Sequence, residues 1–203
     1  DCEKNLLRFF YGSYYLQEGD STIFIKQEPS NIKNHKKIAK DFSRNLIGSL
    51  WNKLVRKEFI VKNGIRFIAG INYSEDLLFC YQMFLNPVKC VYLPKAFYHY
   101  VMQGSSITHA VSKMNIDARL MAYEKIKSIL VDPIYMEDLK IFKFDVVIEA
   151  LKSGLYNANE IFQMYEECNF LTCFKYGIGK KQKFAVVLLS FGLPQYALKL
   201  YHH

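Results

Sequence analysis

The chain has 203 residues, of which 51% are hydrophobic and 23% are charged, and its formal net charge is +8. Abundant tyrosine and phenylalanine beside an ordinary charged fraction exclude a disordered chain, and the length suits one domain, or a domain with a helical appendage. The basic balance indicates an anionic partner. Charge alone does not choose among a phosphate-bearing ligand, nucleic acid and a membrane surface.

The five cysteines, Cys2, Cys80, Cys90, Cys168 and Cys173, lack the CxxC or His-rich spacing of zinc sites. We therefore expect no zinc, reduced thiols and a cytoplasmic protein, with Cys80 and Cys90 in the core. Residues 1–8 are charged and polar, so no signal peptide is expected there. No apolar run approaches the roughly 20 residues of a membrane-spanning helix.

The first half of the chain predicts strands mixed with short helices. Residues 8–25 are rich in β-branched and aromatic residues around Glu18-Gly19-Asp20, which predicts two strands joined by a turn. Beyond a loop at 28–37, we expect helices over 36–50 and 54–63, an extended piece at 65–67, a helix from Ser74 to 85, and strands over 90–93 and 96–101. The helix from Ser74 has a buried stripe made of Leu77, Leu78, Tyr81, Phe84 and Leu85.

The second half predicts helices alone, over 115–131, 137–152, 157–167, 183–191 and 195–201. The composition shifts near residue 110. We therefore expect an α/β part at 1–110, followed by a mainly α-helical C-terminal part at 111–203.

Two acidic pairs stand at predicted helix starts, where exposed N–H groups keep a carboxylate ionised, as a general base must be. Glu75 and Asp76 follow Ser74, and Glu137 and Asp138 open a later helix. Such acids are common at helix starts, so taken alone the first pair favours an ordinary structural role. Nothing around the second pair suggests a site.

Two short clusters could also carry chemistry. The His in Tyr98-His99-Tyr100 can ligate a divalent ion or bind phosphate, although a lone His among aromatic residues is more often a packing residue. The chain's only tryptophan occurs in Trp51-Asn52-Lys53, which is suited to lining a sugar or phosphate pocket, and equally to packing beside two solvated neighbours.

The order and spacing of four blocks carry more information than any block alone. Residues 48–60, with Trp51-Asn52-Lys53, are followed by 63–67, then by 73–79 with Glu75-Asp76, then by 98–107. Together they resemble the C-terminal, acceptor-side half of the inverting family 2 glycosyltransferases, which have a GT-A fold. The resemblance covers about 60 residues and does not clearly extend past His109.

The resemblance implies roles for individual residues. Asp76 would be the catalytic general base with Glu75 as its neighbour, and Trp51, Asn52 and Lys53 would lie near the acceptor. His99 would help to hold a metal-bound diphosphate. The implied partners are a nucleoside diphosphate sugar and a glycan or lipid-linked acceptor, as in polysaccharide biosynthesis, and the implied cofactor of the full-length enzyme is Mg or Mn.

Two departures from the family pattern matter. The family's nucleotide-binding half carries a D-x-D metal site and precedes this region, yet no D-x-D occurs here and only 50 residues precede Trp51. We therefore expect the chain to be inactive alone, with no certain metal of its own. Val101 also stands where the family has an Arg, which weakens the case for phosphate binding at that strand end.

A different class of function stays open, namely a non-catalytic binding module that keeps part of the fold and meets an anionic partner through its basic surface. A nucleic-acid role is not expected, because no recognition motif is present and the lysines are scattered. Residues 169–203 carry five lysines and no acid, beside an apolar block at 184–193. That block predicts either a core helix, the favoured interpretation, or a peripheral contact with an anionic membrane at its inner face.

Overall fold

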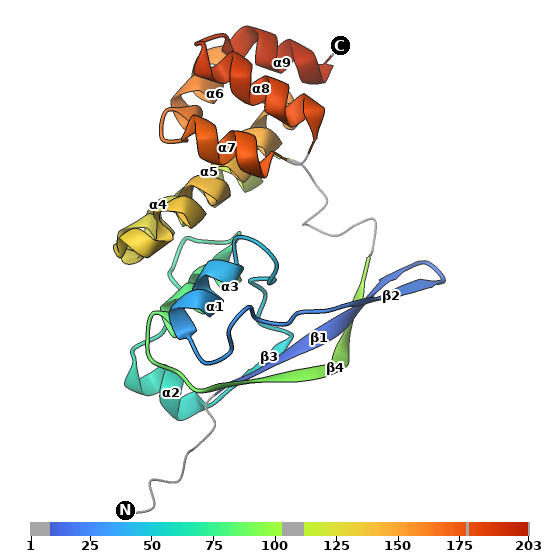
Figure 1. The fold of residues 1–203 in the computed structure, drawn as a ribbon, viewed down its shortest axis with the longest axis vertical. Helices are drawn as coiled ribbons and strands as arrows, with labels where there is room; N and C mark the ends of the chain where they lie inside the picture. The colour runs from blue at the N-terminus through green and yellow to red at the C-terminus, as the bar shows by residue number, and fades with distance from the viewer. Residues whose placement is uncertain (1–8, 103–111, 178, 203) are drawn as a thin grey trace, which may run out of the picture. The chain divides into compact units, whose positions relative to one another are not determined.

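The computed structural model describes residues 9–102, 112–177 and 179–202. Contacts divide the chain into two compact units, Asp1–Ala110 and Val111–His203 (Figure 1). The first unit combines a small sheet with helices and the second is helical. This confirms the expected order of a mixed α/β part and a helical part. Among the described residues, no helix has both the length and the apolar character needed to cross a membrane.

The first unit is built around one central strand. Its strands are β1 (Phe9–Glu18), β2 (Ser21–Ile25), β3 (Lys53–Val55) and β4 (Cys90–Val101). β2 and β3 pair antiparallel with the two ends of β1, while β4 runs parallel to β1 along its length. Gly19 adopts a positive φ of 54° in the turn between β1 and β2, so the predicted strand, turn and strand are confirmed.

β4 pairs irregularly with β1. Gly12 lies opposite Leu93 whereas Leu16 lies opposite Tyr100, so four steps along β1 correspond to seven along β4. Two extra residues, Pro94 and Lys95, fall between the partners of Gly12 and Ser13, and a third falls between the partners of Ser13 and Tyr15. Pro94 has no N–H to donate to a ladder. The strands predicted at 90–93 and 96–101 are therefore one strand with a bulge.

The helices of the first unit are α1 (His35–Asp41), α2 (Lys57–Lys62) and α3 (Glu75–Phe84). α1 and α3 lie side by side on one side of the sheet (Figure 1). The ring of Phe42 packs edge-on against Tyr81 and, at a centroid distance of 5.4 Å, against Phe84. On the predicted stripe of α3, Leu78, Tyr81 and Phe84 are buried while Leu77 and Leu85 are partly exposed.

The helix predicted over 36–50 is too long, because α1 ends at Asp41. The carbonyl of Asp41 accepts the N–H groups of residues 44–46, which closes the chain into turns. Gln27, from the preceding loop, then accepts the N–H of Ile47 at 2.7 Å. The Asp41 carbonyl and the Gln27 side chain thus accept N–H groups that a longer helix would have satisfied.

The helix predicted over 54–63 begins later, at Lys57. Leu54 and Val55 pair instead with β1, and Leu54 is exposed, so it does not share a buried side with Phe59. An open strand edge offered backbone partners that the local pattern did not reveal. Asn63-Gly64 ends α2 as expected, with Gly64 at φ +63°.

The second unit contains the helices α4 (Lys113–Ile129), η2 (Pro133–Tyr135), α5 (Met136–Ser153), α6 (Ala158–Tyr165), α7 (Phe170–Tyr176), α8 (Lys180–Ser190) and α9 (Pro194–His202). α5 buries residues around most of its circumference and ends at Gly154, with φ +67°. The five predicted helices are confirmed with small differences in length. α7 was not predicted, although Asn169, whose side chain accepts the N–H of Thr172, was a readable cap.

Candidate functional site

The first turn of α3 carries Glu75 and Asp76 at the rim of a depression in the first unit. Ser74, just before the helix, has a left-handed backbone with φ 66° and makes no side-chain cap bond. The Ser74 side chain therefore satisfies none of the first N–H groups of α3. Both acids are half-buried.

A second segment, residues 47–52, approaches the start of α3 closely. The backbone N–H of Leu50 donates to Asp76 Oδ2 at 3.1 Å, and the Cys80 thiol donates to the Gly48 carbonyl at 3.2 Å. A Cβ on Gly48 would lie 2.6 Å from Cδ1 and 3.1 Å from Cα of Leu77. The approach therefore requires glycine at position 48.

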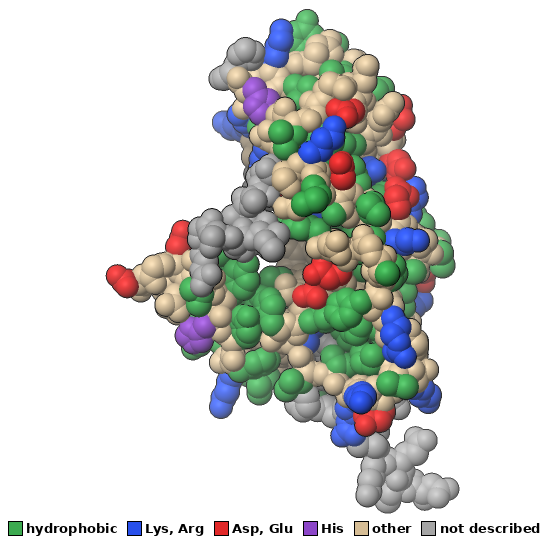
Figure 2. All heavy atoms as spheres, turned by 180° about the vertical axis from the view of Figure 1, so that it is seen from behind, with side chains coloured by type: hydrophobic (Ala, Val, Ile, Leu, Met, Phe, Trp, Pro, Cys, Tyr) green, Lys and Arg blue, Asp and Glu red, His purple; other side chains and the backbone are tan. Residues whose placement is uncertain are grey.

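Trp51 belongs to an aromatic cluster on the sheet. Its ring stacks on Tyr98 at 4.4 Å and on Tyr100 at 5.6 Å between centroids, and meets Tyr14 edge-on at 4.8 Å. Tyr98 is 37% exposed, so the cluster is open to solvent on one side. Figure 2 shows hydrophobic side chains gathered over the sheet at the base of the projecting β1–β2 hairpin.

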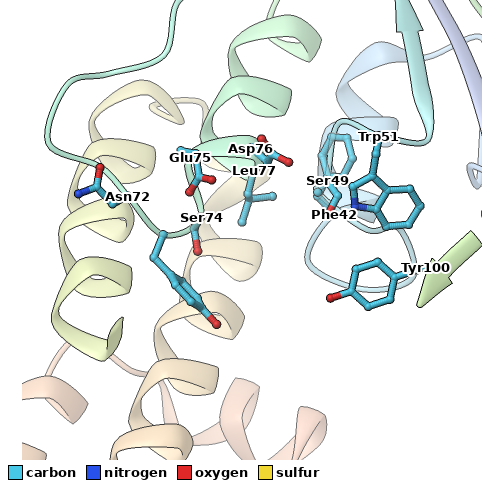
Figure 3. Close-up of a pocket in the computed structure, with 11 residues that line it drawn as sticks. Phe42, Ser49, Trp51, Asn72, Ser74, Glu75, Asp76, Leu77 and Tyr100 are labelled. Atoms are coloured by element: carbon cyan, nitrogen blue, oxygen red, sulfur yellow. The ribbon is translucent and has the colours of Figure 1, made fainter. Parts of the chain in front are cut away.

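These two segments form the walls of one pocket of about 480 Å³. Figure 3 shows Glu75 and Asp76 on one side of it and Trp51 with Tyr100 on the other. The lining residues are Phe42, Gly48, Ser49, Trp51, Asn72, Tyr73, Ser74, Glu75, Asp76, Leu77 and Tyr100. The structure thus brings together three residues singled out from the sequence: Trp51, Glu75 and Asp76.

Asn52 and Lys53 do not line this pocket, because both are buried behind it. Asn52 Nδ2 donates to the Gly12 carbonyl at 3.0 Å. Lys53 Nζ donates to Asn52 Oδ1 at 2.8 Å, to the Ile47 carbonyl at 2.9 Å and to the Ser49 carbonyl. We infer that these two residues hold the 47–52 segment from inside.

Burial dominates the electrostatics behind the pocket. It lowers the pKa of the Lys53 ammonium to about 8, while the nearby Cys80 and Asp76 oppose that shift. It also raises the pKa of the Cys80 thiol to about 11. Cys80 is therefore a neutral, buried thiol at physiological pH, as expected for a core residue, and Lys53 holds a cation close to Asp76.

His99 lies on the opposite face of β4 from Tyr98 and Tyr100, because neighbouring strand residues point to opposite faces. Its ring is exposed and packs on Tyr15 at a centroid distance of 4.8 Å. Within the described ranges, no three His, Cys, Asp or Glu side chains are grouped to hold a metal ion. The residues present do not fit the metal role implied for His99, which stays a prediction without support from this geometry.

Several residues of the pocket and of the aromatic cluster beside it were missed in the sequence. Tyr98 and Tyr100 flanked His99 in the candidate block, and strand alternation alone separates the two tyrosines from the histidine. Asn72 and Ser49 carried no signal of their own. Val101 is exposed at the end of β4, and residues 106 and 107 of the fourth block lie outside the described residues.

No protein-family model matches the chain. Over 70 residues, 34% of the chain, it is 33% identical to a protein named cholesterol galactosyltransferase from Borreliella burgdorferi. Over 66 residues, 32% of the chain, it is 29% identical to the uncharacterized glycosyltransferase YibD of Escherichia coli. Each match spans only 19% of the relative. These partial similarities support a glycosyltransferase function in general.

Proposed function

We propose that this chain forms the acceptor side of an inverting glycosyltransferase of the family 2, GT-A type. The reaction would transfer a sugar from a nucleoside diphosphate to an acceptor hydroxyl, with a glycan or lipid-linked molecule as acceptor. The two partial relatives support the general class. The donor, the inversion and the role of each residue are part of the proposal, as is the assignment of 1–110 to the GT-A half and of 111–203 to a helical extension.

One observation carries the proposal: Asp76 lies in the same pocket as Trp51, on the facing wall (Figure 3). Asp76 Oδ2 accepts the N–H of Leu50, and its other carboxylate oxygen accepts no hydrogen bond from the described residues. A general base needs such an oriented carboxylate with one oxygen available to a substrate hydroxyl.

In this pocket the acceptor hydroxyl donates its proton to Asp76 while its oxygen attacks the anomeric carbon of the donor sugar. The bond from that carbon to the nucleoside diphosphate breaks in the same step, and a single displacement inverts the configuration. Glu75, on the same wall, accepts hydrogen bonds from further acceptor hydroxyls. Trp51 and Tyr100 offer ring faces against which the apolar side of a sugar packs.

A divalent ion, Mg or Mn, would neutralise the leaving diphosphate when bound. Because the described residues do not fit such an ion, we place its ligands with the donor-binding half, outside this chain. Each step assigned to this chain therefore concerns the acceptor alone.

The single tryptophan makes the proposal testable, because Trp51 is in the pocket and its fluorescence reports on occupancy. We expect neutral oligosaccharides from a glycan panel to change the emission saturably, and Tyr100→Ala to weaken that binding. Tyr196→Ala, an exposed tyrosine of α9, should leave it unchanged.

The competing binding module predicts a different pattern. It would respond to a polyanion such as polyphosphate, with loss of the response at high salt, and not to neutral sugars. A pocket that responds to polyphosphate alone would exclude the acceptor role.

A further inference from the structure

α8 and α9 form an open apolar groove on the second unit. The groove has a volume of about 650 Å³ and is lined by Phe184, Leu188, Leu193, Tyr196, Lys199 and Leu200. Phe184 is 55% exposed and Tyr196 is 52% exposed. We call this surface the α8–α9 groove.

α8 is apolar on two opposite sides. Ala185, Val186 and Leu189 are buried in the unit. Phe184 and Leu188 face the groove, and Phe191, 77% exposed, follows at the end of the helix with helical spacing. The block at 184–193 is thus partly a core helix, as the favoured interpretation predicted, and partly an apolar surface that the unit leaves uncovered.

Charge is strongly polarised along the second unit. Residues 111–168 contain seven basic and ten acidic residues, whereas 169–203 contain five lysines and no acid. Lys180, Lys181 and Lys183 occupy the start of α8, where the helix dipole disfavours cations, and Lys199 lines the groove. No described carboxylate forms an ion pair with any of these four lysines.

Two of these lysines lie over aromatic rings of α9. Lys181 Nζ lies 4.6 Å from the ring centroid of Tyr201, and Lys199 Nζ lies 5.8 Å from that of Tyr196. Each ammonium thus lies over an aromatic ring, and cations beside aromatic residues are typical of surfaces that bind at a lipid headgroup boundary.

We propose that the α8–α9 groove docks on an anionic lipid bilayer, with Phe184 and Phe191 entering the interface and the lysines meeting the headgroups. Charge complementarity selects this occupant, because a neutral apolar partner would leave Lys199 in the groove and the three lysines at the start of α8 without a counter-charge. In this proposal α8 and α9 lie along the membrane surface. This proposal does not depend on the reaction proposed for the pocket.

Vesicle sedimentation tests it on the whole chain. We expect the chain to pellet with vesicles of phosphatidylcholine mixed with phosphatidylglycerol at low salt, and to be released at high salt. Changing Lys180, Lys181 and Lys183 together to Gln should lower the partition coefficient about a hundredfold, since each lysine near the surface contributes about fivefold. Phe191→Ser should also weaken binding, and its exposure makes misfolding an unsuitable explanation.

A matched control removes the same charge elsewhere. Lys33, Lys57 and Lys62 are exposed in the first unit, and their joint change to Gln should leave most of the binding intact. The proposal is overturned if the unmodified chain stays in the supernatant at low salt, if both triple variants lose binding equally, or if Phe191→Ser binds normally. Concentration-dependent dimerisation abolished by Phe191→Ser would assign the groove to a second copy instead.

Discussion

The N–H of Leu50 donates a hydrogen bond to Asp76 Oδ2 at 3.1 Å, and so joins the residue before Trp51 to the first turn of α3. Because the donor belongs to the backbone, no change at position 50 other than to proline removes it. The proposed base and the aromatic wall of the pocket are therefore positioned by the same contact.

Asp76→Asn separates chemistry from structure, because an amide oxygen still accepts the Leu50 N–H but an amide is not a base. In an enzyme that joins this segment to a donor-binding half, we expect turnover to fall about a thousandfold while donor binding stays nearly intact. Turnover and donor affinity, measured separately, check this.

Glu137→Gln is the matched control, since Glu137 also lies in the first turn of a helix, α5. It lies 3.8 Å from Lys175 in the second unit, and its loss should leave turnover within about twofold because exposed ion pairs contribute little. Equal losses from both changes would remove Asp76 from the role of base.

The chain alone should not bind a nucleoside diphosphate sugar tightly, because no D-x-D occurs in it and its described residues do not group into a metal site. Calorimetry with several such donors and Mn²⁺ should show no specific heat. A micromolar dissociation constant would mean that the donor site lies within these 203 residues.

Lys53 makes stability depend on pH in a defined window. Burial lowers its pKa from 10.5 to about 8, so the unfolded chain holds the proton more tightly than the folded chain. Stability should therefore rise between pH 8 and 10.5, by about 3 kcal/mol from this group. The measurement is the free energy of unfolding in urea as a function of pH, for the wild type and for Lys53→Met. Identical slopes would contradict the assignment.

Gly48→Ala should destabilise the first unit by about 1–3 kcal/mol, since the new Cβ would meet both the side chain and the backbone of Leu77. Acceptor binding should weaken in parallel as α3 moves away from the 47–52 segment. Gly179→Ala provides the comparison, because its Cβ would meet nothing within 4 Å and its φ is −132°. Thermal unfolding of both variants, followed by circular dichroism, measures the two losses of stability, and equal losses would contradict the clash at Gly48.

Ser74→Gly should stabilise the first unit by about 0.5–1 kcal/mol. A left-handed backbone costs an L-residue more than glycine's extra unfolded freedom, and the Ser74 side chain makes no cap bond to lose. Ser74→Ala keeps the strain and should be nearly neutral. Urea unfolding in which glycine and alanine behave alike would show that the φ of 66° carries no cost.

Local signals predicted the fold well where a helix is defined by its own caps and spacing. Gly154 ends α5, and the Asn157–Glu160 capping box opens α6, so both helices could be predicted from nearby residues. The segment at 42–50 could not, because its backbone partners are Asp41 and Gln27, one of them far away in sequence.

The site was predictable in part for the same reason. Asp76 and Trp51 were recognisable from their blocks, and the pocket unites them. Asn52 and Lys53 look like pocket residues by proximity to Trp51, yet the chain turns them inward to the Gly12 and Ile47 carbonyls. The order of the blocks can be read from the sequence. The direction in which a side chain points depends on tertiary partners that lie outside any short block.

The number of extra residues in the β4 bulge decides which side chains of β4 face Trp51. Three extra residues enter β4 between the partners of Gly12 and Leu16, and an odd number exchanges the two faces of a strand. If the pairing of Cys90 to Leu93 is kept, loss of a single residue near Pro94 would therefore turn Tyr98 and Tyr100 away from Trp51 and bring His99 and Val101 into their places. A one-codon deletion would then give this wall an imidazole without substituting any residue that now lines it.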